Sequence, residues 1–151
     1  IHGRTLFLLE NQAGAGTEVG GDFRQLATIL KKIDLPDRTG ICLDTCHAFA
    51  AGYELRNQAG INALFAELET TVGLSNVPLL HLNDALGAKG AHRDRHTHIG
   101  EGQIGEDGFR CLLTDPRVSG LCGILETPRD EPADDQKNLA VLRRLVTGGT
   151  T

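Results

Sequence analysis

The chain has 151 residues, of which 40% are hydrophobic and 23% are charged, proportions that are ordinary for a globular domain. No segment approaches the about 20 consecutive apolar residues that cross a bilayer, and no signal peptide opens the sequence. We therefore expect a cytoplasmic protein with no membrane partner. The net charge of −5 argues against nucleic-acid binding through overall basicity. This argument is weaker if several acidic residues bind divalent metal ions, because each ion cancels two negative charges.

Four short apolar runs each end in a residue that can bind a metal. They are Leu6–Glu10, Ile41–Asp44, Leu79–His81 and Gly123–Glu126. Continuous runs of this length are typical of strands buried on both faces, which usually belong to parallel sheets.

Segments with helical periodicity follow the strands. Apolar residues recur at helical spacing over Phe23–Ile33, behind a possible N-cap at Asp22, and over Ile61–Val72, before a stop at Gly73. Two more helices are expected: one over Phe109–Leu113, after Asp107 and before Pro116, and one with apolar residues over Leu139–Val146, opened by Asp134 or Asp135. Strand and helix thus alternate four times, which predicts a parallel α/β sheet and about half of an eight-fold (βα) barrel.

We expect residues 1–151 to form a single domain that is incomplete at its N-terminus. The sequence begins with Ile1, contains no Met and enters its first predicted strand almost at once. A half-barrel leaves its two edge strands unpaired, and such edges favour association with another chain.

The polar residues that end parallel strands lie at one rim of the sheet, so Glu10, Asp44, His81 and Glu126 are predicted to converge. Zinc accepts both imidazole nitrogen and carboxylate oxygen, and a carboxylate can bridge two ions in a site for phosphoryl transfer. The four strand ends together predict a metal-dependent enzyme site.

Two further groups point to the same rim. His47 follows Asp44 by three residues and can reach the site from the next loop. Asp94 and His96 flank Arg95, and in an extended loop residues at i and i+2 point the same way. Arg95 is then available to contact a phosphate. Lys89, Arg93 and Arg95 belong to the densest basic stretch of the chain and are the candidate phosphate contacts. His92 and His98 are expected to be ordinary loop residues.

The four cysteines form no Cys-x-x-Cys pair, and the sequence shows no secretory context. We expect reduced thiols, with Cys42 and Cys122 buried in core strands.

Five motifs, in order, resemble the endonuclease IV family of apurinic/apyrimidinic endonucleases. They are Leu8–Gly14, Gly40–Tyr53, His81–Asp84, Asp94–Gly102 and Ile124–Pro128. Together they extend over essentially the whole chain.

The resemblance implies an eight-fold (βα) barrel with up to three zinc ions at its rim. Glu10 would bridge the first and second ions, Asp44, His81 and Glu126 would complete the second, and His47, Asp94 and His96 would hold the third. The implied reaction belongs to base excision repair: hydrolysis of the phosphodiester 5′ to an abasic site in double-stranded DNA. A metal-bound hydroxide would attack phosphorus, with Glu10 and Glu126 as the catalytic carboxylates. Manganese is a possible substitute for zinc.

This chain differs from the family's pattern in its first metal site. The family's first metal takes two histidines from the N-terminal half of the barrel, and His2 lies at the wrong end to replace them. This chain would therefore supply at most two complete zinc sites and would be weakly active or inactive alone. Its expected partner is the missing N-terminal half-barrel, or another copy through the exposed sheet edges.

Two alternatives stay open. One is a metal-dependent sugar isomerase or epimerase on a related barrel, and the other is a catalytically silent metal-binding fragment. Isomerase sites also place Glu, Asp and His at strand ends, but the Asp94-Arg95-His96 loop favours the nuclease.

Overall fold

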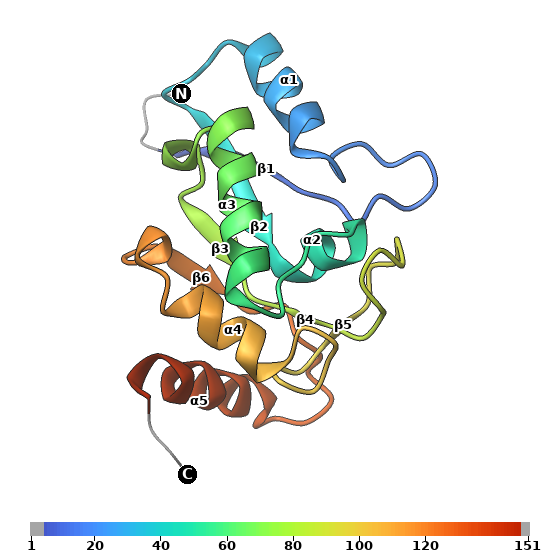
Figure 1. Ribbon diagram of the computed structural model, residues 1–151, viewed down its shortest axis with the longest axis vertical. Helices are drawn as coiled ribbons and strands as arrows, with labels where there is room; N and C mark the ends of the chain where they lie inside the picture. The colour runs from blue at the N-terminus through green and yellow to red at the C-terminus, as the bar shows by residue number, and fades with distance from the viewer. Residues whose placement is uncertain (1–4, 149–151) are drawn as a thin grey trace.

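The computed structural model describes residues 5–148 (Figure 1). Its centre is a parallel sheet with the strand order β1-β2-β3-β6. The strands are β1 (Phe7–Glu10), β2 (Thr39–Asp44), β3 (Leu79–His81) and β6 (Cys122–Ile124). The predicted alternation of strands and helices is confirmed, and four βα units make half of an eight-fold barrel.

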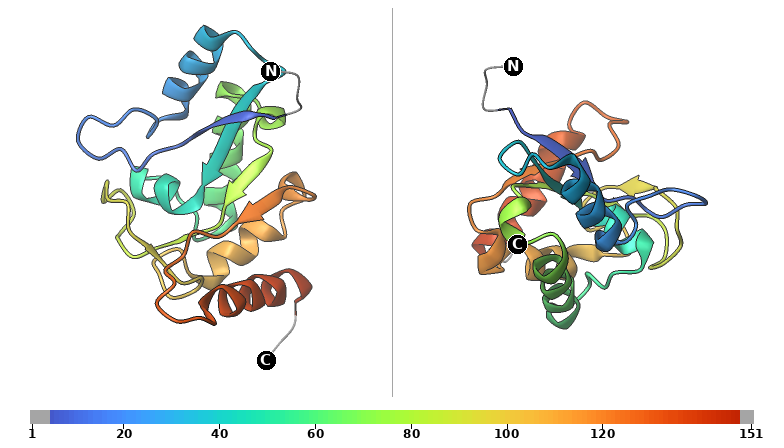
Figure 2. Two further views of the ribbon diagram at one scale, coloured as in Figure 1. Left: turned by 180° about the vertical axis from the view of Figure 1, so that it is seen from behind. Right: turned by 90° about the horizontal axis from the view of Figure 1, so that it is seen from above.

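Four longer helices follow the strands. They are α1 (Phe23–Ile33), α3 (Gln58–Thr71), α4 (Gly105–Leu113) and α5 (Asp134–Thr147). Figure 1 shows α3 and α4 in front of the sheet, and the reverse view in Figure 2 shows the strands in front of these helices. The helices therefore cover one face of the sheet, as on the outside of a barrel.

The strand register brings the carboxyl ends together. Glu10 is level with Cys42, Asp44 with His81, and His81 with Ile124. Because the strands are parallel, their last side chains lie at one rim. Glu126 was predicted at the end of a strand, but it lies two residues beyond β6.

Several short elements were not predicted. Helix α2 (Thr45–Ala51) begins directly after β2, and Asp44 caps it by accepting a hydrogen bond from the backbone N–H of His47. Strands β4 (Asp84–Ala85) and β5 (His96–Thr97) form an antiparallel pair. Two 3₁₀ turns, η1 (Leu74–Asn76) and η2 (Pro116–Val118), precede β3 and β6.

The core lies under the central strands. Ile41 and Leu43 of β2 are fully buried, together with Ile61 and Leu68 of α3 and Phe109 of α4. Burial on both faces is thus confirmed for β2.

For the two edge strands, the prediction of burial on both faces was wrong. Phe7 on β1 is 61% exposed, and all three residues of β6 are exposed, including Cys122. Within the described residues, each of these strands has a sheet neighbour on one side only, so its outer edge stays open to solvent. Cys42, in contrast, is buried as expected.

Within residues 5–148, no helix has the length and apolar character needed to cross a membrane.

Candidate metal centre

Four side chains at or just beyond the ends of the sheet strands form the first group of potential ligands: Glu10, Asp44, His81 and Glu126, each with one donor atom within 4.8 Å of the others. His81 Nδ1 lies at their centre. It is 3.2 Å from Glu10 Oε1, 3.0 Å from Glu126 Oε2 and 3.8 Å from Asp44 Oδ2. The sequence placed these residues at one rim, and the structure brings them together.

The second group consists of His47, Asp94 and His96. Asp94 Oδ1 lies 3.3 Å from His47 Nε2 and 3.1 Å from His96 Nε2, and the two ring nitrogens are 3.4 Å apart. His47 reaches this group from the first turn of α2, not from a loop, while His96 comes from β5. Asp94 and His96 point the same way, as their spacing predicted.

Glu10 lies between the two groups. Its Oε1 atom is 3.2 Å from His81 Nδ1 and 3.1 Å from His47 Nδ1. Its contact with His47 is on the Nδ1 side of the ring, whereas the second group uses Nε2, so Glu10 is a ligand candidate of the first group only and supports the orientation of His47.

Backbone carbonyls orient the two histidines of the second group. His47 Nδ1 lies 2.9 Å from the carbonyl oxygen of Asn11, and His96 Nδ1 lies 3.1 Å from that of Glu126. With Nδ1–H donating in each ring, both Nε2 atoms present a lone pair toward Asp94. Metal-binding histidines are typically oriented in this way by the opposite ring nitrogen.

The spacing of the donors fits zinc. In a tetrahedron with bonds of ~2.0–2.2 Å, neighbouring ligand atoms lie ~3.3–3.6 Å apart. The second group has separations of 3.1, 3.3 and 3.4 Å. Little rearrangement is needed for these three atoms to share one ion, and their mixed nitrogen and oxygen chemistry suits zinc or manganese better than magnesium.

The pKa values reflect the concentration of charge at this rim. A hydrogen bond with His47 is the main cause that lowers the pKa of Glu10, whereas burial raises the pKa of Asp44. Burial alone would lower the pKa of His47, but the hydrogen bond with Glu10 and the negative charges of Asp44 and Asp94 raise it to about 9. Without a metal, protonated histidine balances part of the negative charge.

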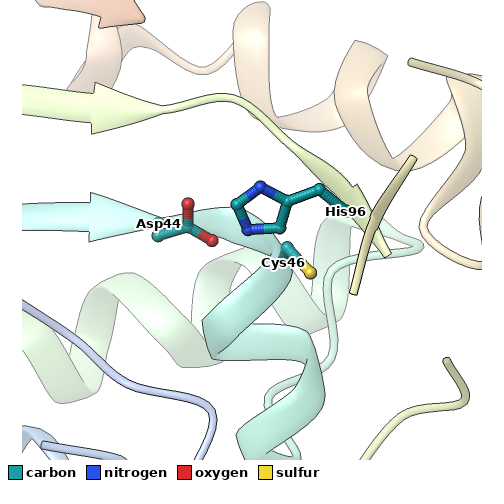
Figure 3. A group of neighbouring side chains, drawn as sticks. All are labelled: Asp44, Cys46 and His96. Atoms are coloured by element: carbon teal, nitrogen blue, oxygen red, sulfur yellow. The ribbon is translucent and has the colours of Figure 1, made fainter. Parts of the chain in front are cut away.

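A third set, Asp44, Cys46 and His96, also has donor atoms within 4.8 Å of one another (Figure 3). The sulfur of Cys46 is turned away from the Asp44 carboxylate and contacts the carbonyl oxygen of Arg95 at 3.5 Å. Burial raises the pKa of this thiol to about 12. A protonated thiol is a poor ligand, so oxygen and nitrogen donors dominate this rim.

The three basic candidates differ in their surroundings. Lys89 pairs with Glu54 at 3.1 Å, so its charge is already compensated. Arg93 and Arg95 are exposed and form no ion pair with any described residue. Of the other loop histidines, His92 is exposed and His98 contacts Asn138.

Three buried residues beside the ligands were not predicted as part of the site: Asn11, Thr45 and Asn83. Asn11 directly follows the end of β1, and Asn83 lies two residues after the end of β3. This position just after a strand is the one sequence feature that could have indicated a role in the site. The partners of these two residues lie 33 to 43 residues away and become visible only in the folded chain. His2 lies outside the described residues.

Comparisons with known proteins agree with the half-barrel fold. The sequence model of a family described as xylose isomerase-like TIM barrel matches residues 5–145. A probable endonuclease 4 from Chloroflexus aurantiacus is 49% identical over 149 residues. This chain belongs to the endonuclease IV family of xylose isomerase-like TIM barrels.

Other endonuclease IV relatives agree. A probable endonuclease 4 from Methanosphaerula palustris is 46% identical over 143 residues, covering 95% of this chain and 50% of its own length. The crystal structure of endonuclease IV from Thermus thermophilus superimposes with a TM-score of 0.82 at 40% identity, covering 95% of this chain and 51% of that structure.

The match to the Chloroflexus protein covers 98% of this chain and 52% of that protein. The chain therefore spans about half the length of the relatives that it matches.

Proposed function

We propose that this chain is the C-terminal half of a zinc-dependent endonuclease that hydrolyses the phosphodiester 5′ to abasic sites in double-stranded DNA. The observation that carries the proposal is the pair of ligand groups at one rim of the sheet, in a chain whose relatives are named endonuclease 4. A centre with two neighbouring ions is suited to phosphodiester hydrolysis.

The residues have distinct tasks in this proposal. Glu10, Asp44, His81 and Glu126 would hold one ion, and His47, Asp94 and His96 would hold another. Glu10 would also contribute to a further ion, which the missing half-barrel would complete. When bound, the ions would supply Lewis acidity that stabilises negative charge developing on the phosphate and the leaving oxygen. Glu10 and Glu126 are the proposed catalytic carboxylates because both belong to the first group and are partly accessible to substrate.

The exposed arginines are the proposed DNA contacts. Arg95 lies between two ligands of the second group, and Arg93 lies two residues before it. Their charges would attract the phosphate backbone toward the metals and offset the acidic surface of the chain. Lys89 would have to leave Glu54 to take part, so its contribution should be smaller. An abasic sugar is easily turned out of the helix, because no base pair has to be broken.

The rest of the barrel is the proposed partner. Strands β1 and β6 each offer an unpaired edge within the described structure, and the matched relatives are about twice as long. Four further strands from another segment would close the barrel between these edges.

Reconstitution tests the proposal. The half of the Chloroflexus relative that this chain does not match is produced separately, mixed with this chain and zinc, and assayed on a labelled duplex with one abasic site. We expect little incision by either piece alone and clear incision by the mixture, on the 5′ side of the lesion. An Asp94→Ala/His96→Ala double variant should abolish it, and an undamaged duplex should stay intact.

The result that contradicts the proposal is a stable, zinc-loaded complex of the two pieces that leaves the abasic duplex intact. Such a complex would bind metal without catalysing DNA cleavage, as the alternative of a catalytically silent metal-binding fragment predicts. Conversion of a ketose to an aldose by the same complex would support the sugar isomerase alternative.

A further inference from the structure

Asn83 lies among the ligands of the first group without being one of them. Its side chain is fully buried, and the residue lies two positions after the end of β3 at His81 and directly before Asp84 of β4. Its Nδ2 atom donates to Asp44 Oδ2 at 2.6 Å and faces Glu126 Oε2 at 3.4 Å. Its Oδ1 atom accepts the backbone N–H of Glu126 at 2.8 Å. One amide thus connects two strand ends on either side of β3.

The orientation of this amide is determined by its partners. If oxygen and nitrogen exchanged places, the oxygen would face the Asp44 carboxylate and the NH₂ group would face the N–H of Glu126. Both contacts would be repulsive, so the orientation with Nδ2 toward Asp44 is the one that satisfies every atom.

The backbone of Asn83 is held as firmly as its side chain. Its N–H donates to Thr45 Oγ1 at 2.9 Å, and the same hydroxyl donates to the carbonyl oxygen of Asn83 at 2.7 Å. Thr45 is also fully buried and begins α2 directly after Asp44. The position of the amide is therefore coupled to the end of β2.

The charge at this rim gives the amide a specific task. The carboxylates of Glu10, Asp44 and Glu126 lie around one imidazole, and in the absence of a metal His81 Nδ1 can donate to them. When His81 binds a metal through Nδ1, that atom must offer its lone pair and no longer donates a proton. The amide of Asn83 does not bind the metal and keeps its N–H groups, so it donates to the carboxylates both with and without a bound ion.

We propose that Asn83 is a positioning residue that sets the zinc affinity of the first group by holding Asp44 and Glu126 at the angle at which both can share an ion with His81. This inference rests on the proposed function, because it requires that the first group bind metal. Asn83 itself is no ligand, since its Nδ2 cannot coordinate and its Oδ1 is taken by the backbone of Glu126.

Zinc affinity tests the inference without an activity assay. Every variant carries His96→Ala, so that the second group is disabled and the titration against a competing fluorescent chelator reports the first group. We expect Asn83→Ala to weaken zinc binding by about 10–100-fold, the usual effect of losing a hydrogen-bond partner of a ligand.

Asn138 provides the matched control. It is another buried asparagine with several hydrogen bonds: it accepts from Ile99 N and donates to Thr127 Oγ1 and to the carbonyl oxygen of Asp134. None of these partners belongs to the first group. Asn138→Ala should destabilise the chain about as much as Asn83→Ala but leave the zinc affinity unchanged.

Asn83→Ser is the second variant, in case the alanine variant does not fold. Its hydroxyl can donate to one carboxylate, so we expect an affinity between those of the parent and Asn83→Ala. Replacing zinc by Co²⁺ adds a spectroscopic measurement: the visible absorption bands should change in the Asn83 variants and not in Asn138→Ala.

The outcomes separate the two claims. If the parent chain binds zinc and the folded Asn83 variants bind it equally well, the role of Asn83 is refuted while the metal centre stands. If the parent chain itself binds no zinc, the metal centre of the proposed function fails, and this inference with it.

Discussion

Asn11 places both atoms of its side-chain amide on the backbone of Asp44, accepting from its N–H at 2.7 Å and donating to its carbonyl oxygen at 3.1 Å. Its own carbonyl oxygen faces His47 Nδ1. Potential metal ligands can be recognised in the sequence because the side chains of His, Asp and Glu are themselves the groups that bind metals. The residues that orient them are not, because an amide can serve any site and its partner here is 33 residues away.

At the same scale, Asp115 allows a prediction about pH. It is buried, accepts Arg117 Nη2 at 2.6 Å and also accepts Gln58 Nε2. The hydrogen bond from Arg117 is the main cause that lowers the pKa of Asp115 from 3.8 to about 2. A lowered pKa in the folded state stabilises the fold above pH ~4, and this contribution is lost as the pH falls toward ~2.

We therefore expect Asp115→Asn to lower the free energy of unfolding by about 1–2 kcal/mol between pH 5 and 8. The difference from the parent should shrink steadily below pH ~4. Urea unfolding of both proteins at several pH values measures it. A difference that is equally large at pH ~2.5 would show that the ion pair with Arg117 is not its cause.

Among the elements, the long periodic segments were the predictable ones. Helices α1 and α5 appear where apolar spacing placed them, and α5 begins at Asp134, one of the two residues expected to open it. Helix α2 has 7 residues and lies almost wholly in the core, so it shows no amphipathic pattern. The pairing of β4 with β5 rests on contacts that no local pattern encodes.

The carboxylate of Asp84 is the main contact that holds the β4–β5 pair against the next loop. It is fully buried and accepts backbone N–H groups of that loop at distances of 2.9 to 3.2 Å: those of Gly100, Gly102, Ile104 and Gly105. It also accepts the N–H of its neighbour Ala85 at 2.8 Å. Strand β5 carries His96, so this contact also supports the second ligand group.

We expect Asp84→Asn to lower the free energy of unfolding by about 2–4 kcal/mol, because the new NH₂ group would face N–H donors. Hydrogen exchange of the amides at 100–105 should quicken more than that of β2. Asp107→Asn, an exposed acid in the first turn of α4, is the control and should change stability by less than ~0.5 kcal/mol. Unaltered exchange at 100–105 would refute this role of Asp84.

The whole molecule is a sheet with two open edges. The alternation of strands and helices predicted a half-barrel with two unpaired edges, whereas the apolar runs of the edge strands predicted burial on both faces. Burial of an edge strand depends on neighbours, and residues 5–148 contain none beyond β1 or β6. Phe7 is the most accessible large apolar side chain on an edge strand.

We expect the isolated chain to associate through these edges, and Phe7→Lys to reduce that association, because a charge on an edge strand opposes strand pairing. Light scattering over a concentration series measures it. Leu35→Lys changes a similarly accessible apolar residue, 54% exposed, outside the sheet, and should leave association unchanged. If both variants associate like the parent, the edges are not the contact surface.

The central claim is that strand ends and two adjoining elements bring seven side chains into two metal-binding groups: Glu10, Asp44, His47, His81, Asp94, His96 and Glu126. The most direct test is the zinc content of the folded chain after incubation with zinc and gel filtration. The account predicts up to two zinc ions per chain, one fewer after Asp94→Ala/His96→Ala, and a further loss when Glu10→Ala is added. A folded chain that elutes with no zinc would contradict it.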